Sequence, residues 1–324
     1  MKPRLAVIGA LGLALAVYLV VTAGAGSVVS AAAAVGWEGF AILCLYAGGL
    51  FIPLGIAWYV IVPPHAYAPL RILIWGRMVR DAASEVLPFS HVGGLVLGAR
   101  AATSSGVAKP LVIASMIVDV TTETLAQVIY AAAGVAIFSQ YLPRGAMPAS
   151  TTALLAVCVG LTAVAAVLLL ALRRHGRRLI EQLAARFFPD ALAATASLAD
   201  TLEMMYRGRA RLGFGVALHF AGWIASAVGV WIAFRLMNVH IGLVAVLAIE
   251  SLVYAARSAA ALVPNALGVQ EAAYAVLCPY FGVGAEVGLG VSLLKRARDI
   301  AVGVPIMLLW QALEGHRAFR RVRL

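Results

Sequence analysis

The sequence predicts an all-α polytopic membrane protein with about six full spans and two re-entrant segments in an inverted-topology repeat. Hydrophobic residues make up 63% of the 324 residues and charged residues only 12%, against about a quarter charged in soluble domains. Apolar runs of about 18 residues or more, long enough to span a bilayer, recur along the whole chain. In addition, Pro and Gly break two hydrophobic stretches, and paired breaks of this kind are typical of transporters built from inverted repeats.

The apolar runs predict the spans in chain order. They cover residues 5–25, 37–62, 107–138, 151–172, 212–237 and 287–310. The first run follows Lys2 and Arg4 as a signal peptide would, but it is long and no polar domain follows it, so we expect a retained span. The chain (1–324) then forms one transmembrane domain with repeat 1, repeat 2 and an intervening basic loop at 37–172, 212–311 and 173–211.

The distribution of charge predicts the orientation. The two ends of the chain, the stretch 63–81 and the basic loop hold 17 of the 25 Lys and Arg residues. The opposite loops, 26–36 and 139–150, contribute only Arg144. Because basic loops stay on the cytoplasmic side, we expect both termini in the cytoplasm.

The two broken segments lie at 66–102 and 241–284. They read Arg80-DAASEV-Leu87-Pro88-FSHVG-Gly94 and Arg257-SAAAL-Val263-Pro264-NAL-Gly268. An odd number of spans separates them, so as re-entrant segments they would enter the membrane from opposite faces. Alternatively, 83–101 and 241–262 are ordinary spans. That count also leaves the C-terminus inside, but it reverses the placement of Arg144 and the basic loop.

Residues 70–85 form a predicted amphipathic helix just before the first break. Leu70, Leu73, Ile74 and Met78 share one helical face and Arg71 lies on another. Such a pattern predicts a helix lying in the membrane interface.

Ionisable residues inside a membrane cost about 2.5–3.5 kcal/mol each on insertion scales, so they face a cavity or a partner. Asp119 and Glu123 lie one turn apart on the third span, and Lys295 and Asp299 lie one turn apart on the last. We expect the acids of one helix and the bases of the other to neutralise each other at a shared interface. The alternative is a structural ion-pair network that only locks helices together.

A broken helix frees backbone groups that only protein or a water-filled cavity can satisfy. Its half-helix N-termini would favour an anionic headgroup, although ordinary proline kinks would give the same residues. His91 is a candidate proton carrier or headgroup donor. The candidate substrate-binding or coupling residues are Glu85, Pro88, His91, Gly94, Arg100, Asp119, Glu123, Glu250, Arg257, Pro264, Asn265, Gly268, Gln270, Glu271, Lys295, Arg298 and Asp299.

Other function classes have no support in the sequence. The His and Cys residues have no metal-ligand spacing, and no nucleotide-binding or hydrolase motif occurs. The basic residues flank spans rather than forming a nucleic-acid patch. We therefore expect no metal, no cofactor, no nucleic-acid partner and no enzymatic activity.

Two stretches carry a family resemblance. Leu262-VPNALG-VQEAAY-Ala275 and Ser292-LLKRARDI-Ala301 resemble the HpnL family of hopanoid-biosynthesis-associated membrane proteins. That family is similar to the lysylphosphatidylglycerol synthase transmembrane region, or flippase-like, superfamily. Asn265 stands where members commonly have Gly. The resemblance implies a bacterial inner-membrane protein that handles lipids, without lipid aminoacylation, because the chain stops at Leu324 just past the last span.

Together these observations predict a lipid flippase for a hopanoid or another polar lipid, whose headgroup enters a midplane cavity. Membrane lipids are the expected partners, together with other lipid-biosynthesis or transport proteins. Two alternatives stay open. One is an intramembrane enzyme with Glu271 or Asp119 as general base, and the other is a non-catalytic scaffold for lipid biosynthesis.

Overall fold

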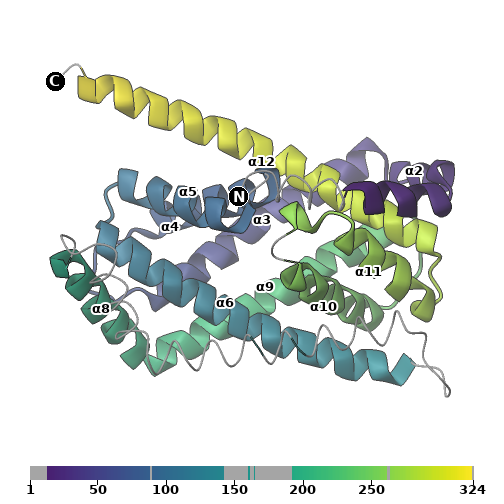
Figure 1. Cartoon of the computed structure of the whole chain (residues 1–324), viewed down its shortest axis with the longest axis horizontal. Coiled ribbons are helices and arrows are strands. Elements are labelled where there is room, and N and C mark those ends of the chain that lie inside the picture. The colour runs from purple at the N-terminus through teal and green to yellow at the C-terminus, as the bar shows by residue number, and fades with distance from the viewer. Residues whose placement is uncertain are drawn as a thin grey trace.

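The computed structural model describes residues 13–87, 90–141, 160, 164, 192–260 and 263–322, and their regular secondary structure is helical throughout (Figure 1). Almost all of the expected span at 151–172, residues 173–191 of the basic loop, and Pro88 lie outside this part of the chain. The side chain of His91 also lies outside it.

Among the described residues, three helices are long and apolar enough to cross a membrane. They are α3 (Gly36–Ile61), α6 (Lys109–Phe138, extended to Tyr141 by the short helix η1, Ser139–Tyr141) and α9 (Arg209–Leu236). Their bounds agree with the second, third and fifth expected spans. The last expected span lies within α12 (Ala285–Val322), a 38-residue helix that contains Pro305.

The first expected span does not continue straight. Its helix Leu13–Thr22 is followed by α2 (Ala25–Ala33) after a bend of 93°. Gly24 lies in the bend with a φ of 90°, a conformation that costs glycine little. The pair counts as a fourth candidate span only if the bent helices cross together.

Each broken segment forms a helix–break–helix hairpin. In the first, α4 (Leu70–Val86) packs against α5 (Ser90–Ser104), and in the second α10 (Leu243–Ala259) packs against α11 (Val269–Leu277). The break of the second hairpin contains the 3₁₀ turn η3 (Pro264–Ala266), and η4 (Cys278–Phe281) follows α11.

Gly94 and Gly98 allow the close contact inside the first hairpin. A Cβ atom at Gly94 would lie 2.5 Å from the Arg80 carbonyl oxygen, and one at Gly98 would lie 2.9 Å from that of Gly76. These pairings run in opposite directions along the two helices, so α4 and α5 are antiparallel. Gly94 is therefore a packing residue.

Helix α4 is not the interfacial helix that its apolar face predicts. Ile72, Leu73, Val79 and Ala83 are buried, and the Arg77 side chain is 3% exposed, because α4 packs against α3, α5 and α12. Helical periodicity finds an apolar face but does not distinguish lipid from neighbouring helices as the material that covers it.

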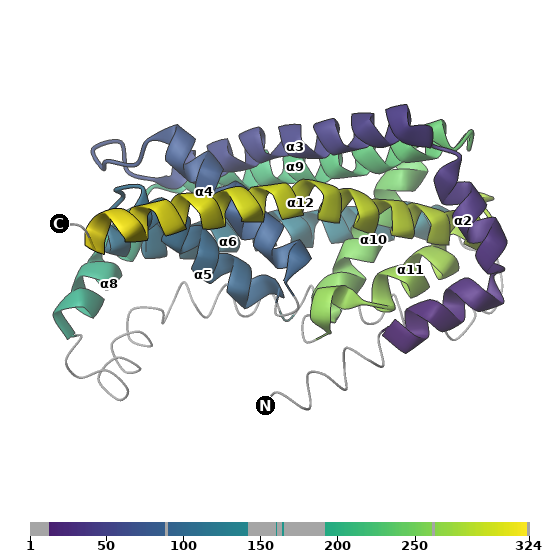
Figure 2. The same cartoon turned by 90° about the horizontal axis from the view of Figure 1, so that it is seen from above.

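Helices α3 and α9 run side by side in opposite directions (Figure 2). The beginning of α3 meets the end of α9, where Gly39 faces Leu236, and the end of α3 meets the beginning of α9, where Ile61 faces Gly215. Between them the Tyr46 hydroxyl donates a 2.8 Å hydrogen bond to the Ala225 carbonyl oxygen. Small residues on each helix accommodate large side chains of the other.

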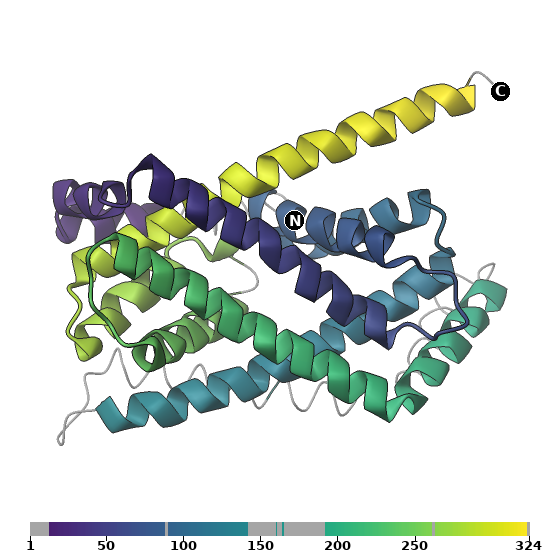
Figure 3. The same ribbon diagram turned by 180° about the vertical axis from the view of Figure 1, so that it is seen from behind.

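The helices that follow the hairpins pack on the opposite hairpin. Helix α6 follows the first hairpin and packs against α10, and α12 follows the second and packs against α4 (Figures 1 and 3). The α6–α9 contact of one half corresponds to the α12–α3 contact of the other. Likewise, the contact of α2 with α12 corresponds to that of α8 (Leu192–Arg207) with α6. The contacts of the two halves thus correspond helix by helix.

Candidate functional site

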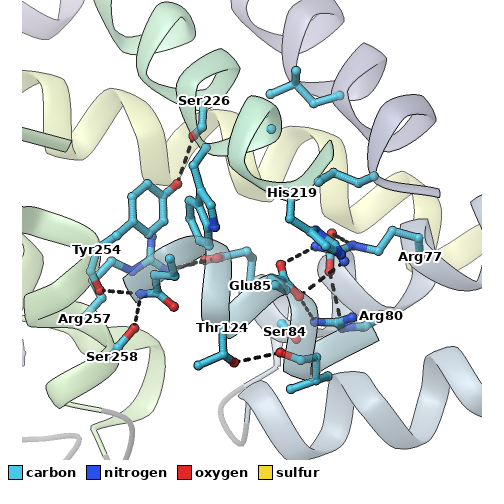
Figure 4. Close-up of a pocket in the computed structure, with 18 of the residues that line it drawn as sticks. Arg77, Arg80, Ser84, Glu85, Thr124, His219, Ser226, Tyr254, Arg257 and Ser258 are labelled. Carbon is cyan, nitrogen blue, oxygen red and sulfur yellow. Dashed lines mark hydrogen bonds and ion pairs between the residues drawn. The ribbon is translucent and has the colours of Figure 1, made fainter. Parts of the chain in front are cut away.

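A cavity of about 490 Å³ lies between the first hairpin and the helices α3, α6, α9 and α10 (Figure 4). A smaller cavity of about 150 Å³ adjoins it and reaches α12. Both cavities are lined by Leu50, Leu54, Asp81, Glu85, Ser226 and Tyr254. Charged and aromatic side chains from both halves of the chain therefore meet around one space.

One wall of the large cavity is an ion-pair network between α4 and α6. Arg77 lies 2.6 Å from Glu123 and 3.2 Å from Asp119, and Arg80 lies 2.5 Å and 2.7 Å from the same two carboxylates. Arg77 also lies 2.6 Å from Asp81. The network forms because residues three or four apart share a helical face, so two arginines face two acids across the helix contact.

His219 of α9 joins this network. Its Nε2 atom lies 3.0 Å from Oδ1 of Asp119, and the residue is 1% exposed. One turn before Asp119 on α6, Ser115 accepts a 3.0 Å hydrogen bond from the Trp58 indole. Polar contacts among Trp58, Ser115, Asp119 and His219 thus hold the three helices α3, α6 and α9 together.

The two helix breaks meet at Glu85. Arg257 of the second hairpin lies 2.9 Å from the Glu85 carboxylate, and Asn265 donates a 3.0 Å hydrogen bond to the Glu85 carbonyl oxygen. Asn265 adopts a φ of 49° in the left-handed region, where Asn is tolerated better than most residues other than Gly. Asn265 therefore combines a left-handed backbone with a side-chain contact to the first hairpin.

A second charged network locks α10, α11 and α12. Lys295 lies 2.6 Å from Glu250 and donates a 3.0 Å hydrogen bond to the Tyr274 hydroxyl, which also hydrogen-bonds Glu250. Arg296 lies 2.6 Å from Glu271. None of these four charged residues lines the large cavity.

Glu271 and Gln270 have structural contacts in this network. The Gly268 amide donates a 2.8 Å hydrogen bond to the Glu271 carboxylate, which caps α11, and Gly268 has a φ of 79°. Gln270 donates a 2.8 Å hydrogen bond to Ser292 of α12. These contacts hold the second break against the last helix.

Aromatic residues form the side of the large cavity opposite Arg77 and Arg80. Trp223 and Tyr254 pack edge to face with ring centroids 4.6 Å apart, and the Tyr254 hydroxyl lies 3.1 Å from that of Ser226. The Arg257 guanidinium lies 5.6 Å from the centre of the Tyr254 ring. Figure 4 shows Tyr254, Arg257 and Ser258 on one side, His219, Arg77 and Arg80 on the other, and Glu85 between them.

Comparison with known proteins gives one match. Residues 7–306 match the family model described as the lysylphosphatidylglycerol synthase TM region. The chain belongs to this family. Membership together with the apolar helices makes it a multi-pass helical membrane protein. No curated protein and no solved structure matches it.

The predicted site residues fall into three groups. Glu85, Glu123 and Arg257 line the large cavity, with Asp119 directly behind, and Arg298 and Asp299 line the smaller one. Glu250, Lys295, Gln270 and Glu271 lie in the locking network of α10–α12, and Pro264, Asn265 and Gly268 form the second break. Arg100 lies apart, in a 2.8 Å ion pair with Glu314 and with its side chain 59% exposed.

The acids of α6 and the bases of α12 do not neutralise each other as expected. Asp119 and Glu123 pair with α4, and Lys295 pairs with α10. Each charged face instead pairs with the hairpin that precedes its own helix, so the acids of α6 and the bases of α12 do not meet. Arg77 and Arg80, taken in the sequence as topology signals in a cytoplasmic stretch, are the actual partners of the α6 acids.

The sequence contains no pattern that points to His219 or Asp81 either. A single histidine in an apolar run carries no pattern, and Asp81 follows directly after an arginine as in any interfacial helix. One signal could have found the arginines. Arg77 and Arg80 are three residues apart, and Asp119 and Glu123 are four apart on a second helix. Each spacing places the two residues of a pair on one helical face.

Proposed function

We propose that the protein translocates a polar lipid between the leaflets of a bacterial inner membrane. The observation that carries the proposal is the cavity of about 490 Å³ lined by Arg77, Arg80, Glu85, Glu123 and Arg257 inside a bundle of apolar helices. Ionised groups at such depth are rare and mark pathways for polar cargo. A cavity of this size falls in the range of small-molecule sites, so it fits a headgroup while the tails stay in the bilayer.

Family membership supports a role in lipid handling. The narrower resemblance to HpnL supports a hopanoid or another polar lipid as the cargo. Translocation needs no covalent step, so the proposed role is that of a transporter rather than an enzyme. Membrane lipids are its partners.

We further propose that the two halves are an inverted-topology repeat with both hairpins re-entrant. The antiparallel packing of α3 and α9 and the exchanged contacts of α4 with α12 and α10 with α6 support it. The concentration of basic residues at both ends of the chain supports cytoplasmic termini. The contacts of Glu85 with Arg257 and Asn265 would then join two hairpins that enter from opposite faces.

The orientation is tested with single cysteines at positions 88 and 264, introduced after removal of the three native cysteines. A membrane-impermeant reagent is added from one side of sealed vesicles. We expect each position to react preferentially from a different side, and equal labelling of both from one side would contradict the inverted repeat.

Translocation is tested in proteoliposomes that contain lipids labelled on the headgroup. Purified protein is expected to move labelled lipid across the bilayer faster than protein-free liposomes do, with and without an imposed ion gradient. Lipid that stays on its starting leaflet under every gradient would refute the function.

A matched pair of variants links translocation to the cavity. Arg80→Gln removes a cavity cation whose side chain is 11% exposed, while Arg100→Gln makes the same chemical change in a side chain that is 59% exposed. We expect the first to lose most of the translocation rate and the second to keep it. Equal rates in the two variants would show that headgroups do not pass through this cavity.

A further inference from the structure

The network beside the large cavity is short of one positive charge. Two guanidinium groups, Arg77 and Arg80, contact three carboxylates, those of Asp81, Asp119 and Glu123. The other ion pairs between described residues each join one cation to one anion. They are Arg257–Glu85, Arg298–Asp299, Lys295–Glu250, Arg296–Glu271, Arg100–Glu314 and Arg207–Glu203.

His219 is placed where the missing charge is needed. Both arginines contact Oδ2 of Asp119, whereas His219 Nε2 lies 3.0 Å from the other oxygen, Oδ1. His219 is 1% exposed and lines the cavity. Its second ring nitrogen, Nδ1, has no hydrogen-bond partner among the described residues. A buried polar atom of this kind is rare in a native structure.

None of the helices α3, α4, α6 and α10 carries a histidine. Helix α6 contributes Asp119 and Glu123 to this region, α4 contributes the two arginines, Asp81 and Glu85, and α10 contributes Tyr254 and Arg257. The only Asp, Glu, Lys or Arg of α3 is Glu38, in its first turn, at the end where α3 meets the last turn of α9. Histidine is the side chain whose charge changes most readily near neutral pH.

We propose that His219 is the proton-binding site of the cavity. As an imidazolium it donates to Asp119 through Nε2 and brings the network of two arginines and three carboxylates to neutrality. When Nδ1 gives its proton to water entering the cavity, the imidazole becomes neutral and the network carries one net negative charge. No other bond is made or broken in this step.

The gain and loss of a proton at His219 couple the charge of the cavity wall to protonation. A headgroup that enters meets a wall whose net charge differs by one between the two states, so its passage depends on whether His219 holds a proton. This consequence rests on the proposed translocation, whereas the proton site itself does not.

The charge state is measured by nitrogen NMR of ¹⁵N-histidine-labelled full-length protein in nanodiscs at about pH 7. The chain has six histidines, and the spectrum of His219→Gln assigns the signal of interest. We expect imidazolium shifts for His219 in the wild type. A neutral imidazole in the wild type would overturn the proposal on its own.

Variants that remove one carboxylate test the charge balance. Asp81→Asn and Glu123→Gln each leave two acids facing two arginines, so His219 is expected to become neutral in both. Glu314→Gln is the matched control, because Glu314 pairs with Arg100 outside this network, and it is expected to keep the imidazolium. An imidazolium that persists in both network variants would also overturn the proposal.

Translocation in proteoliposomes with an imposed proton gradient tests the coupling. The wild-type rate is expected to change with the gradient and the His219→Gln rate to be independent of it. An unchanged gradient response in His219→Gln would overturn the coupling. Absence of any translocation by the wild type would refute the proposed function, and the NMR result would still decide the proton site.

Discussion

Substitution of Lys295 tests whether the second charged network locks the helices. Lys295 Nζ lies 2.6 Å from Glu250, and the two side chains are 3% and 0% exposed. Lys295→Met removes the cation at similar side-chain length and leaves Glu250 buried without its charge partner. Breaking a buried pair in this way costs about 3–5 kcal/mol, mostly as the penalty on the orphaned charge.

The double variant Glu250→Gln/Lys295→Met separates this penalty from general loss of packing. It removes both charges, so its free energy of unfolding is expected within about 1–2 kcal/mol of the wild type, since replacing both partners of a buried pair is often close to neutral. The free energy of unfolding is measured by denaturant titration of the helical signal in mixed micelles. The control is Lys109→Met, an exposed lysine at the beginning of α6, expected to change stability by less than about 0.5 kcal/mol.

Two results would refute the reasoning. A cost for Lys295→Met as small as that for Lys109→Met would mean that the pair does not stabilise the fold. A double variant as destabilised as the sum of the two single variants would mean that the charges do not depend on each other.

Three further predictions concern the packing of the helices. Gly94→Ala places a Cβ 2.5 Å from the Arg80 carbonyl oxygen and is expected to cost about 1–3 kcal/mol of overpacking in the same titration; an unchanged stability would show that α4 and α5 separate without cost. Asn265→Val forces a β-branched residue to a φ of 49°, at about 1–3 kcal/mol, whereas Asn265→Gly is expected to preserve more stability; the reverse order would contradict the left-handed backbone. Cysteines at Gly39 and Leu236 are expected to cross-link on mild oxidation, because a Cβ at Gly39 lies 3.2 Å from the Leu236 side chain, and no cross-link would contradict the antiparallel packing of α3 and α9.

The sequence predicts the helices well and their partners poorly. The bounds of α3, α6 and α9 follow from apolar runs, and the two breaks follow from Pro and Gly, because both signals are local. Which helix covers which hairpin is not a local property. Nothing in the residues of α6 indicates that it lies on α10 rather than beside α12, and so the expected pairing of their charges was wrong.

The candidate site was predictable where polar residues repeat along a helix. Asp119 and Glu123 share a helical face, and that spacing identified one wall of the cavity. The sequence predicts a topological role for Arg77 and Arg80, because basic residues near a span end normally remain in water. Only tertiary packing brings these two arginines to side-chain exposures of 3% and 11%.

The charges form two clusters, one in each half of the chain. Helix α6 pairs its acids with α4, and α12 pairs Lys295 with α10 and Arg296 with α11. On the α10–α12 side Glu250 and Glu271 each have one cation partner, and Tyr274 and Ser292 supply further hydrogen bonds. On the α4–α6 side one carboxylate exceeds the arginines, and that is the side where the large cavity and His219 lie. In our proposal, a proton on His219 balances this cluster. The two halves of the chain, similar in their helix contacts, thus differ in charge balance beside the cavity.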